Sequence, residues 1–197
     1  MPSERFAELR ALIGSDARRM RVLELVRELA LSDCWVAAGF VRNCVWDHLH
    51  GRTPSPLPQD IDVIWFEPAQ ASAERDAALE LALRRRDASL AWSVKNQARM
   101  HGRNADLPYR SAGDAMRYWP ETATAVGVRL DDRGAVEVAA PLGLDDLFGL
   151  IVRPTRRFEG EKHAVYLDRI RGKNWQATWP RLKIRMDLPL QSSGTAR

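Results

Sequence analysis

The stretch at residues 59–66, Gln-Asp-Ile-Asp-Val-Ile-Trp-Phe, decides the fold class of this chain. Its β-branched and aromatic residues from Ile61 onward predict a buried strand, because such side chains fit a pleated, half-covered surface. Side chains alternate along a strand, so the carboxylates of Asp60 and Asp62 are expected to project from one face. Two neighbouring carboxylates repel each other and do nothing for strand stability. A pair of this kind is typical of a site for a divalent metal ion.

A second motif lies about twenty residues upstream, where residues 35–43 read Trp-Val-Ala-Ala-Gly-Phe-Val-Arg-Asn. This pattern predicts a short strand, a glycine turn and a helix. The free N–H groups at the start of a helix favour an anion such as phosphate. Gly39 would let that anion approach the backbone, and Arg42 would add a charged fork. The alternative is an ordinary tight turn with Arg42 in solvent.

Each motif is weak alone, since an isolated Asp-x-Asp usually marks an exposed strand edge. Together they supply complementary halves of one site. The glycine turn would hold a triphosphate, and the carboxylates would hold magnesium that bridges to its phosphates. The combination predicts a site for a metal-bound nucleotide.

Bulk composition is that of an ordinary globular domain. The chain has 197 residues, of which 45% are hydrophobic and 28% are charged. We expect one domain over residues 1–190, with N-terminal helices at 1–32, a sheet core at 33–140 and C-terminal helices at 141–190. A disordered tail is expected at residues 191–197. The net charge of +4 suits nucleotides or RNA but does not require them.

Strand and helix patterns alternate early in the chain and pair locally later. A third strand is expected at residues 91–97, a hairpin at 125–139 and a helix at 144–152. This order predicts an α+β (mixed α/β) fold, in which helices pack on a mixed sheet. Most of the tryptophans lie in apolar segments and are expected in the core.

The chain carries no sign of export or membrane insertion. Its start lacks the apolar run of a signal peptide, and no segment approaches the ~20 apolar residues of a membrane span. Cys34 and Cys44 lack metal-ligand spacing and are expected to be reduced packing residues. We therefore expect a cytoplasmic protein with no membrane partner.

A dense polar group begins on the third strand. Lys95 and Arg99 are its two candidates for contact with phosphate or an acceptor. Ordinary surface charge pairing is the alternative for both.

The combined motifs at residues 38–43 and 60–62 resemble the signature of the nucleotidyltransferase superfamily that includes DNA polymerase beta. The form Gly-x-Val-Arg is closest in style to tRNA CCA-adding enzymes and poly(A) polymerases. Segments 94–101, 119–130 and 140–148 are also similar to a bacterial group of small nucleotidyltransferase-like proteins. The similarity runs from about residue 35 to residue 182.

This resemblance implies the nucleotidyltransferase fold and a cofactor, Mg²⁺ (or Mn²⁺). It implies metal binding and catalysis by Asp60 and Asp62. The nucleotide-binding candidates are Gly39, Arg42, Asn43, Lys95 and Arg99. It also implies an NTP substrate and an unknown hydroxyl acceptor, which is a small molecule, a protein or RNA.

Two departures from the superfamily pattern bear on whether the chain is catalytically active. Asn43 stands where CCA-type sequences have aspartate, and Ser93 stands where relatives have the third carboxylate. Glu137, between apolar neighbours, is the candidate substitute. A catalytically weak or inactive nucleotide-binding or regulatory module therefore remains the alternative to an enzyme. A basic RNA-binding protein is disfavoured by the modest charge excess, and no DNA-specific motif occurs.

Overall fold

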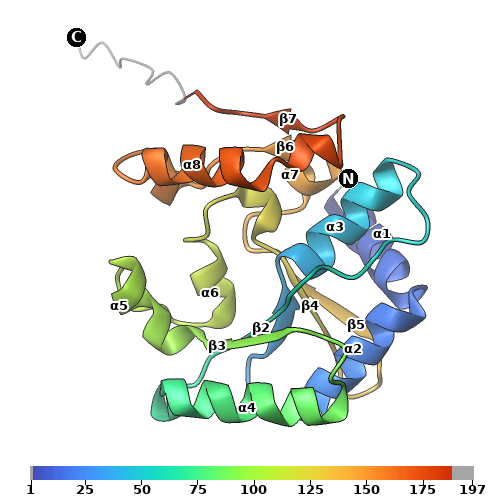
Figure 1. Ribbon diagram of the computed structural model, residues 1–197, viewed down its shortest axis with the longest axis vertical. Helices are drawn as coiled ribbons and strands as arrows, with labels where there is room; N and C mark the ends of the chain where they lie inside the picture. The colour runs from blue at the N-terminus through green and yellow to red at the C-terminus, as the bar shows by residue number, and fades with distance from the viewer. Residues whose placement is uncertain (1, 188–197) are drawn as a thin grey trace.

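A computed structural model describes residues 2–187 of the chain (Figure 1). Its main sheet consists of β1 (Trp35–Ala37), β2 (Ile61–Trp65), β3 (Trp92–Asn96), β4 (Gly127–Leu130) and β5 (Val136–Ala139). The helices are α1 (Pro2–Gly14), α2 (Ala17–Arg27), α3 (Gly39–Leu49), α4 (Ala73–Arg86), α5 (Met100–Asn104), α6 (Ala112–Met116), α7 (Asp145–Phe148) and α8 (His163–Lys173). The tail expected at residues 191–197 lies outside the described residues.

The sheet is mixed and has the strand order β3-β2-β1-β4-β5. Strands β2 and β3 run parallel, while the pairs β1–β2, β1–β4 and β4–β5 are antiparallel. Helices pack on this sheet, which confirms the α+β fold predicted from the sequence.

The register of the sheet gives its two faces different characters. One row across the strands consists of valines, namely Val36, Val63, Val94, Val128 and Val138. The adjacent row, on the opposite face, consists of Ala37, Asp62, Ser93, Gly127 and Ala139. Valine side chains form a continuous apolar surface, whereas the small residues around the aspartate leave space above the sheet.

Helices cover the two faces to different extents. Residues of α1, α2, α3 and α4 pack with the valine row in the main core. Figure 1 shows α1–α3 on one side of the sheet and α5 and α6 on the other. Ala112 and Met116 of α6 reach the second face and pack with Trp35 and Ile64. The small-residue row is thus only partly covered.

The predicted helix at residues 144–152 is wrong in its second half. Helix α7 ends at Phe148, and Leu150 has a positive φ of 56°, which a helix does not accommodate. The chain continues as β6 (Ile151–Val152), which pairs in parallel with β7 (Lys183–Ile184). The segment expected to hold only C-terminal helices therefore also holds a two-stranded sheet.

Two further expectations concern the core and the membrane. Trp35, Trp46, Trp65 and Trp175 are buried, and both cysteines are free and buried, as predicted. Among residues 2–187, no helix has the length and apolar character needed to cross a membrane.

Candidate functional site

The sheet register brings the glycine turn and the aspartate strand together. Asp62 pairs with Ala37, the last residue of β1, and α3 begins two residues later at Gly39. Among residues 2–187 no side chain caps this helix, so its first N–H groups have no side-chain acceptor, and they follow the end of β1 that pairs with Asp62. Pro58, just before the aspartates, lies 3.6 Å from the position that a Cβ on Gly39 would occupy. The two predicted motifs therefore form one corner of the molecule.

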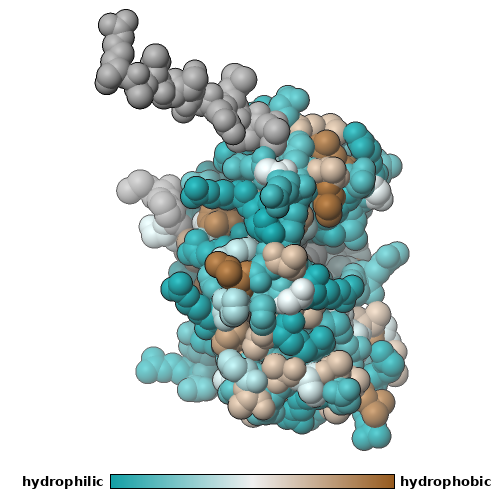
Figure 2. Space-filling model, turned by 90° about the vertical axis from the view of Figure 1, so that its left-hand side faces the viewer, coloured by the Kyte–Doolittle hydropathy of each residue, from teal (hydrophilic) through white to brown (hydrophobic). Residues whose placement is uncertain are grey.

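A cavity of about 250 Å³ opens beside this corner. It lies over the small-residue row of the sheet, and its far wall comes from α5, the segment after α6, and α8. The residues that line it are Ala38, Asp62, Val63, Ile64, Ser93, Lys95, Gln97, Met100, Asn104, Trp119, Pro120, Thr124 and Arg169. The surrounding surface, on the side that carries α5 and α6, is mainly hydrophilic (Figure 2).

Burial and a neighbouring negative charge dominate the electrostatics of Asp62. Burial raises the pKa of Asp62 to about 6, and the negative charge of Asp60 adds to the rise. A hydrogen bond from Ser93 opposes the rise, and so do the positive charges of Arg42 and Arg169. A bound cation would relieve both the repulsion and the burial cost.

The donor set fits Mg²⁺. Asp60 and Asp62 offer carboxylate oxygens, and the hydroxyl of Ser93 lies beside Asp62 in the next strand. No cluster of three metal-ligating side chains occurs among residues 2–187. Magnesium commonly uses only one or two protein carboxylates and completes its shell with water and phosphate oxygens. The short ligand list is therefore compatible with a magnesium–nucleotide site.

Arg42 is buried beside the glycine turn, not in solvent, and its Nη2 lies 3.6 Å from the position that a Cβ on Gly39 would occupy. It is 7% exposed, and its guanidinium lies 4.4 Å from the ring of Trp175 and 5.1 Å from that of Trp46. Its Nη1 donates to Thr124 Oγ1 at 3.1 Å and its Nη2 to Asn43 Oδ1 at 3.0 Å. Burial lowers the pKa of Arg42 to about 10, so it stays charged at neutral pH. Arg42 is thus neither in solvent nor in the cavity lining.

The other nucleotide-binding candidates divide into two groups. Lys95 lines the cavity, although its Nζ also donates to Glu80 at 2.8 Å. Arg99 is not part of the cavity, because its Nε donates to the buried carboxylate of Asp76 at 3.0 Å. Ordinary charge pairing, the alternative for Arg99, describes its surroundings.

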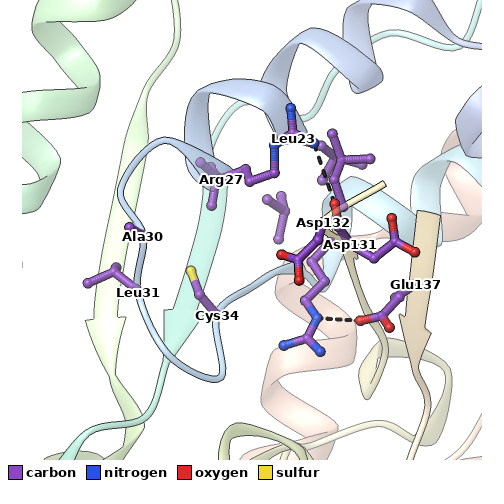
Figure 3. A pocket seen from close by; sticks show the side chains of 12 residues that line it. Leu23, Arg27, Ala30, Leu31, Cys34, Asp131, Asp132 and Glu137 are labelled. Carbon is purple, nitrogen blue, oxygen red and sulfur yellow. Dashed lines mark hydrogen bonds and ion pairs between the residues drawn. The ribbon is translucent and has the colours of Figure 1, made fainter. Parts of the chain in front are cut away.

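Glu137 does not replace the third carboxylate. It lies on β5, which is separated from β2 by β1 and β4, so the two strands are about 14 Å apart. Its carboxylate pairs with Arg129 at 2.6 Å in a separate cavity of about 400 Å³ (Figure 3). Ser93, by contrast, lies on β3, the strand next to β2, where it pairs with Asp62.

Ala38 has a strained backbone at the corner of the site. Its φ and ψ are 54° and −119°, a region that glycine adopts readily and alanine does not. We expect Ala38→Gly to stabilise the fold by about 1 kcal/mol, because relief of 1–3 kcal/mol of strain exceeds the added entropy of the unfolded chain. Urea denaturation of both proteins measures this difference.

Gly39→Ala is the matched control for that substitution. Gly39 has no positive φ, and a Cβ there would meet its nearest neighbours at 3.6 Å, an ordinary contact. We expect a change of less than about 0.5 kcal/mol. A stabilisation by Gly39→Ala larger than that by Ala38→Gly would contradict the strain assigned to Ala38.

Sequence reasoning missed two residues of the site. Arg169 of α8 lines the cavity, and its Nε donates at 2.6 Å to Glu121, which is fully buried. Arg169 follows Asp62 by more than a hundred residues, and its neighbours form an ordinary amphipathic helix. No local pattern distinguishes it from Arg171, which pairs with Asp168 at the surface.

The fold and the corner of helix and aspartates together define a nucleotidyltransferase-type domain. The chain belongs to the nucleotidyltransferase family, whose family model matches residues 24–184. It is 37% identical to a structure described as revealing a CCA-adding enzyme head domain, with a TM-score of 0.81. That comparison covers 91% of this chain and 95% of the other.

More distant structures share the fold alone. A CCA-adding enzyme in complex with CTP is 13% identical, with a TM-score of 0.55. The Thermotoga maritima CCA-adding enzyme complexed with tRNA is 15% identical, with a TM-score of 0.54. Both comparisons cover 91% of this chain but only 43% and 42% of the enzymes, so the chain spans less than half of their length. A comparison with proteins of curated function found no match.

Proposed function

We propose that this chain transfers a nucleoside monophosphate from an NTP to a hydroxyl acceptor, with Mg²⁺ held by Asp60 and Asp62. The register that sets Asp62 beside the start of α3 is the observation that carries this proposal. It supports the proposal because an uncapped helix start, suited to an anion, lies beside Asp62, a carboxylate suited to a cation that lines the cavity. Those are the two partners that a metal-bound triphosphate needs.

The residues of the chain have separate tasks in this reaction. The first N–H groups of α3 bind phosphate oxygens, and Gly39 leaves them accessible. Arg42 and Asn43 lie behind that turn, and Arg42 ties it to the rest of the chain through its hydrogen bond to Thr124. Lys95 lies in the cavity wall, from which its ammonium adds positive charge near the phosphates. Bound magnesium would supply neutralisation of phosphate charge.

Transfer then needs orientation more than covalent chemistry by the protein. The acceptor oxygen bonds to the α-phosphorus, the bond to the bridging oxygen breaks, and pyrophosphate leaves with the bonding electrons. The hydroxyl proton passes to water, because serine at position 93 is no base at neutral pH. Most of the rate enhancement would come from positioning and charge stabilisation.

Similar structures suggest which acceptor and which nucleobase of the NTP to test first. Structurally similar CCA-adding enzymes have been seen with CTP and with tRNA. CTP and an RNA 3′ end are therefore the first substrates to test, followed by small-molecule and protein hydroxyls.

One observation favours a second candidate function. Ser93, not a carboxylate, lies against Asp62. A chain that keeps the metal–nucleotide site but lacks the third acid would bind nucleotide without efficient turnover. Such a chain would act as a nucleotide-binding or regulatory module.

The two candidates separate in one experiment. Each NTP is titrated against the protein with and without Mg²⁺, and pyrophosphate release is followed with each acceptor class. Metal-dependent binding with release supports the enzyme, and metal-dependent binding without release supports the module. Release that appears only in Ser93→Asp would place the deficit at the third acid. Equal binding by wild type and Asp60→Asn would refute the site.

A further inference from the structure

Helix α8 contributes a cation to the cavity from a distant part of the chain. Arg169 is one of two basic residues in the cavity lining, together with Lys95. Its side chain is 32% exposed, so it is only partly buried and lines the cavity. It also lies close enough to Asp62 for its positive charge to act on that carboxylate.

The way in which Arg169 is held leaves most of its donors free. Its Nε donates to Oε1 of Glu121 at 2.6 Å. Within residues 2–187, neither Nη atom of Arg169 has a hydrogen-bond partner. A guanidinium has five N–H donors, so four remain for a ligand, in a planar fork that matches phosphate.

Glu121 is a buried carboxylate that accepts a hydrogen bond from Arg169 and whose negative charge also acts on Arg42. It is 0% exposed, and its second oxygen, Oε2, has no hydrogen-bond partner among the described residues. A buried carboxylate with an unsatisfied oxygen destabilises the fold. Its hydrogen-bonding role in the described structure is to fix Arg169. A buried, destabilising carboxylate that orients a guanidinium with unused donors is an arrangement suited to ligand binding.

The other nearby cations lack comparable freedom. Both Nη atoms of Arg42 are engaged by Thr124 and Asn43. The guanidinium of Arg42 lies 4.4 Å from the ring of Trp175, and that of Arg169 lies farther from the same ring, at 5.9 Å. The ammonium of Lys95 donates to Glu80 and to the carbonyl of Val94. Arg169 is therefore the basic group of the cavity with the most unused donors.

We propose that Arg169 binds the β- and γ-phosphates of the nucleotide and that Glu121 is its positioning residue. The assignment moves the phosphate fork from Arg42, where the sequence suggested it, to a helix at the other end of the chain. It rests on the proposed function, because it needs a nucleotide in this cavity. Arg42 then has a structural task, which is to hold the turn at Gly39.

The test compares a triphosphate with a monophosphate of the same nucleoside. Calorimetric titration with Mg·CTP and with CMP measures how much the extra phosphates contribute to binding. In Arg169→Gln we expect CTP affinity to fall about 10- to 100-fold, with CMP affinity changed less than about threefold. In Arg169→Lys we expect a smaller loss, because the charge stays and the fork is lost.

Glu121→Gln tests the positioning role. It keeps the shape of the side chain and weakens its hold on Nε, so the preference for CTP over CMP should shrink about 3- to 10-fold. Arg171→Gln, on the exposed side of the same helix, is the matched control and should behave as wild type. If Arg169→Gln does not fold, the double variant with Glu121→Gln removes both charges and serves in its place.

The outcomes separate this inference from the function on which it rests. If wild type prefers CTP over CMP and Arg169→Gln, or the double variant, keeps that preference, the role of Arg169 is overturned and the proposed function stands. If wild type binds no NTP in the presence of Mg²⁺, both are overturned. A loss of CMP and CTP affinity in equal measure would also overturn the phosphate assignment.

Discussion

Asp62→Asn is expected to abolish metal-dependent nucleotide transfer and, at the same time, to stabilise the protein. Loss of one carboxylate removes half of the proposed cation site, so we expect the rate of the proposed transfer to fall at least 100-fold, which is about 2.7 kcal/mol. The fold, in contrast, loses a charged group that is half-buried next to another negative charge. A residue retained against stability is the mark of a functional site.

The sign of the stability change follows from the pKa of Asp62. This pKa is about 6 in the folded chain, above the usual 3.8, so the folded state binds the proton more tightly than the unfolded state. Wild-type stability therefore falls as pH rises from about 4 to 6, and the full cost applies above pH 6. At pH 7.5 we expect Asp62→Asn to be more stable by about 1–3 kcal/mol.

Denaturation with a chelator present measures this difference without metal. The advantage of Asp62→Asn should vanish below about pH 4, where both proteins are neutral at this position. Asp132→Asn, at an exposed position of the β4–β5 turn, is the control and should change neither activity nor the pH profile. An Asp62→Asn protein that is less stable than wild type at pH 7.5 would show that Asp62 holds the fold rather than a ligand.

Trp175→Ala is expected to have the largest effect on stability. Trp175 is 5% exposed, and its ring contacts that of Trp46 edge-on at a centroid distance of 5.4 Å. The guanidinium of Arg42 stacks on it at 4.4 Å. Deletion of such a side chain creates a cavity and costs about 3–5 kcal/mol. The melting temperature should fall by about 10 °C, since 1 kcal/mol corresponds to about 2–4 °C at this size.

Trp175→Ala should also disturb the candidate site, because Trp175 supports Arg42 behind the turn at Gly39. Nucleotide affinity of the folded variant is expected to fall as well. Trp175→Phe retains an aromatic ring and should recover most of the stability, so thermal denaturation of the three proteins tests the contact directly. A cost below about 1 kcal/mol for Trp175→Ala would mean that the C-terminal segment does not hold this part of the core.

Much of the site was readable in the sequence because its parts are local. A strand of alternating residues fixes the direction of Asp62, and a glycine after a short strand predicts an uncapped helix start. The mixed sheet followed from the order of strands and helices. The strand and the helix start each depend on backbone propensities over about ten residues, and the sheet depends on the order of such segments, all of which the sequence carries directly.

What the sequence could not give depends on contacts between distant segments. Glu137 and Ser93 have similar apolar neighbours, and only the strand order shows that one is remote from Asp62 and the other adjacent to it. Arg42 and Arg169 are both arginines on helices. Packing against Trp175 buries the first, whereas Glu121 leaves the second with free donors in the cavity.

The sequence by itself determined the two motifs and the mixed sheet. Tertiary structure alone decided which charges share the cavity, because strand register and helix packing join residues more than a hundred positions apart. The local sequence pattern sets the direction of a side chain, but tertiary contacts with distant segments decide its partners.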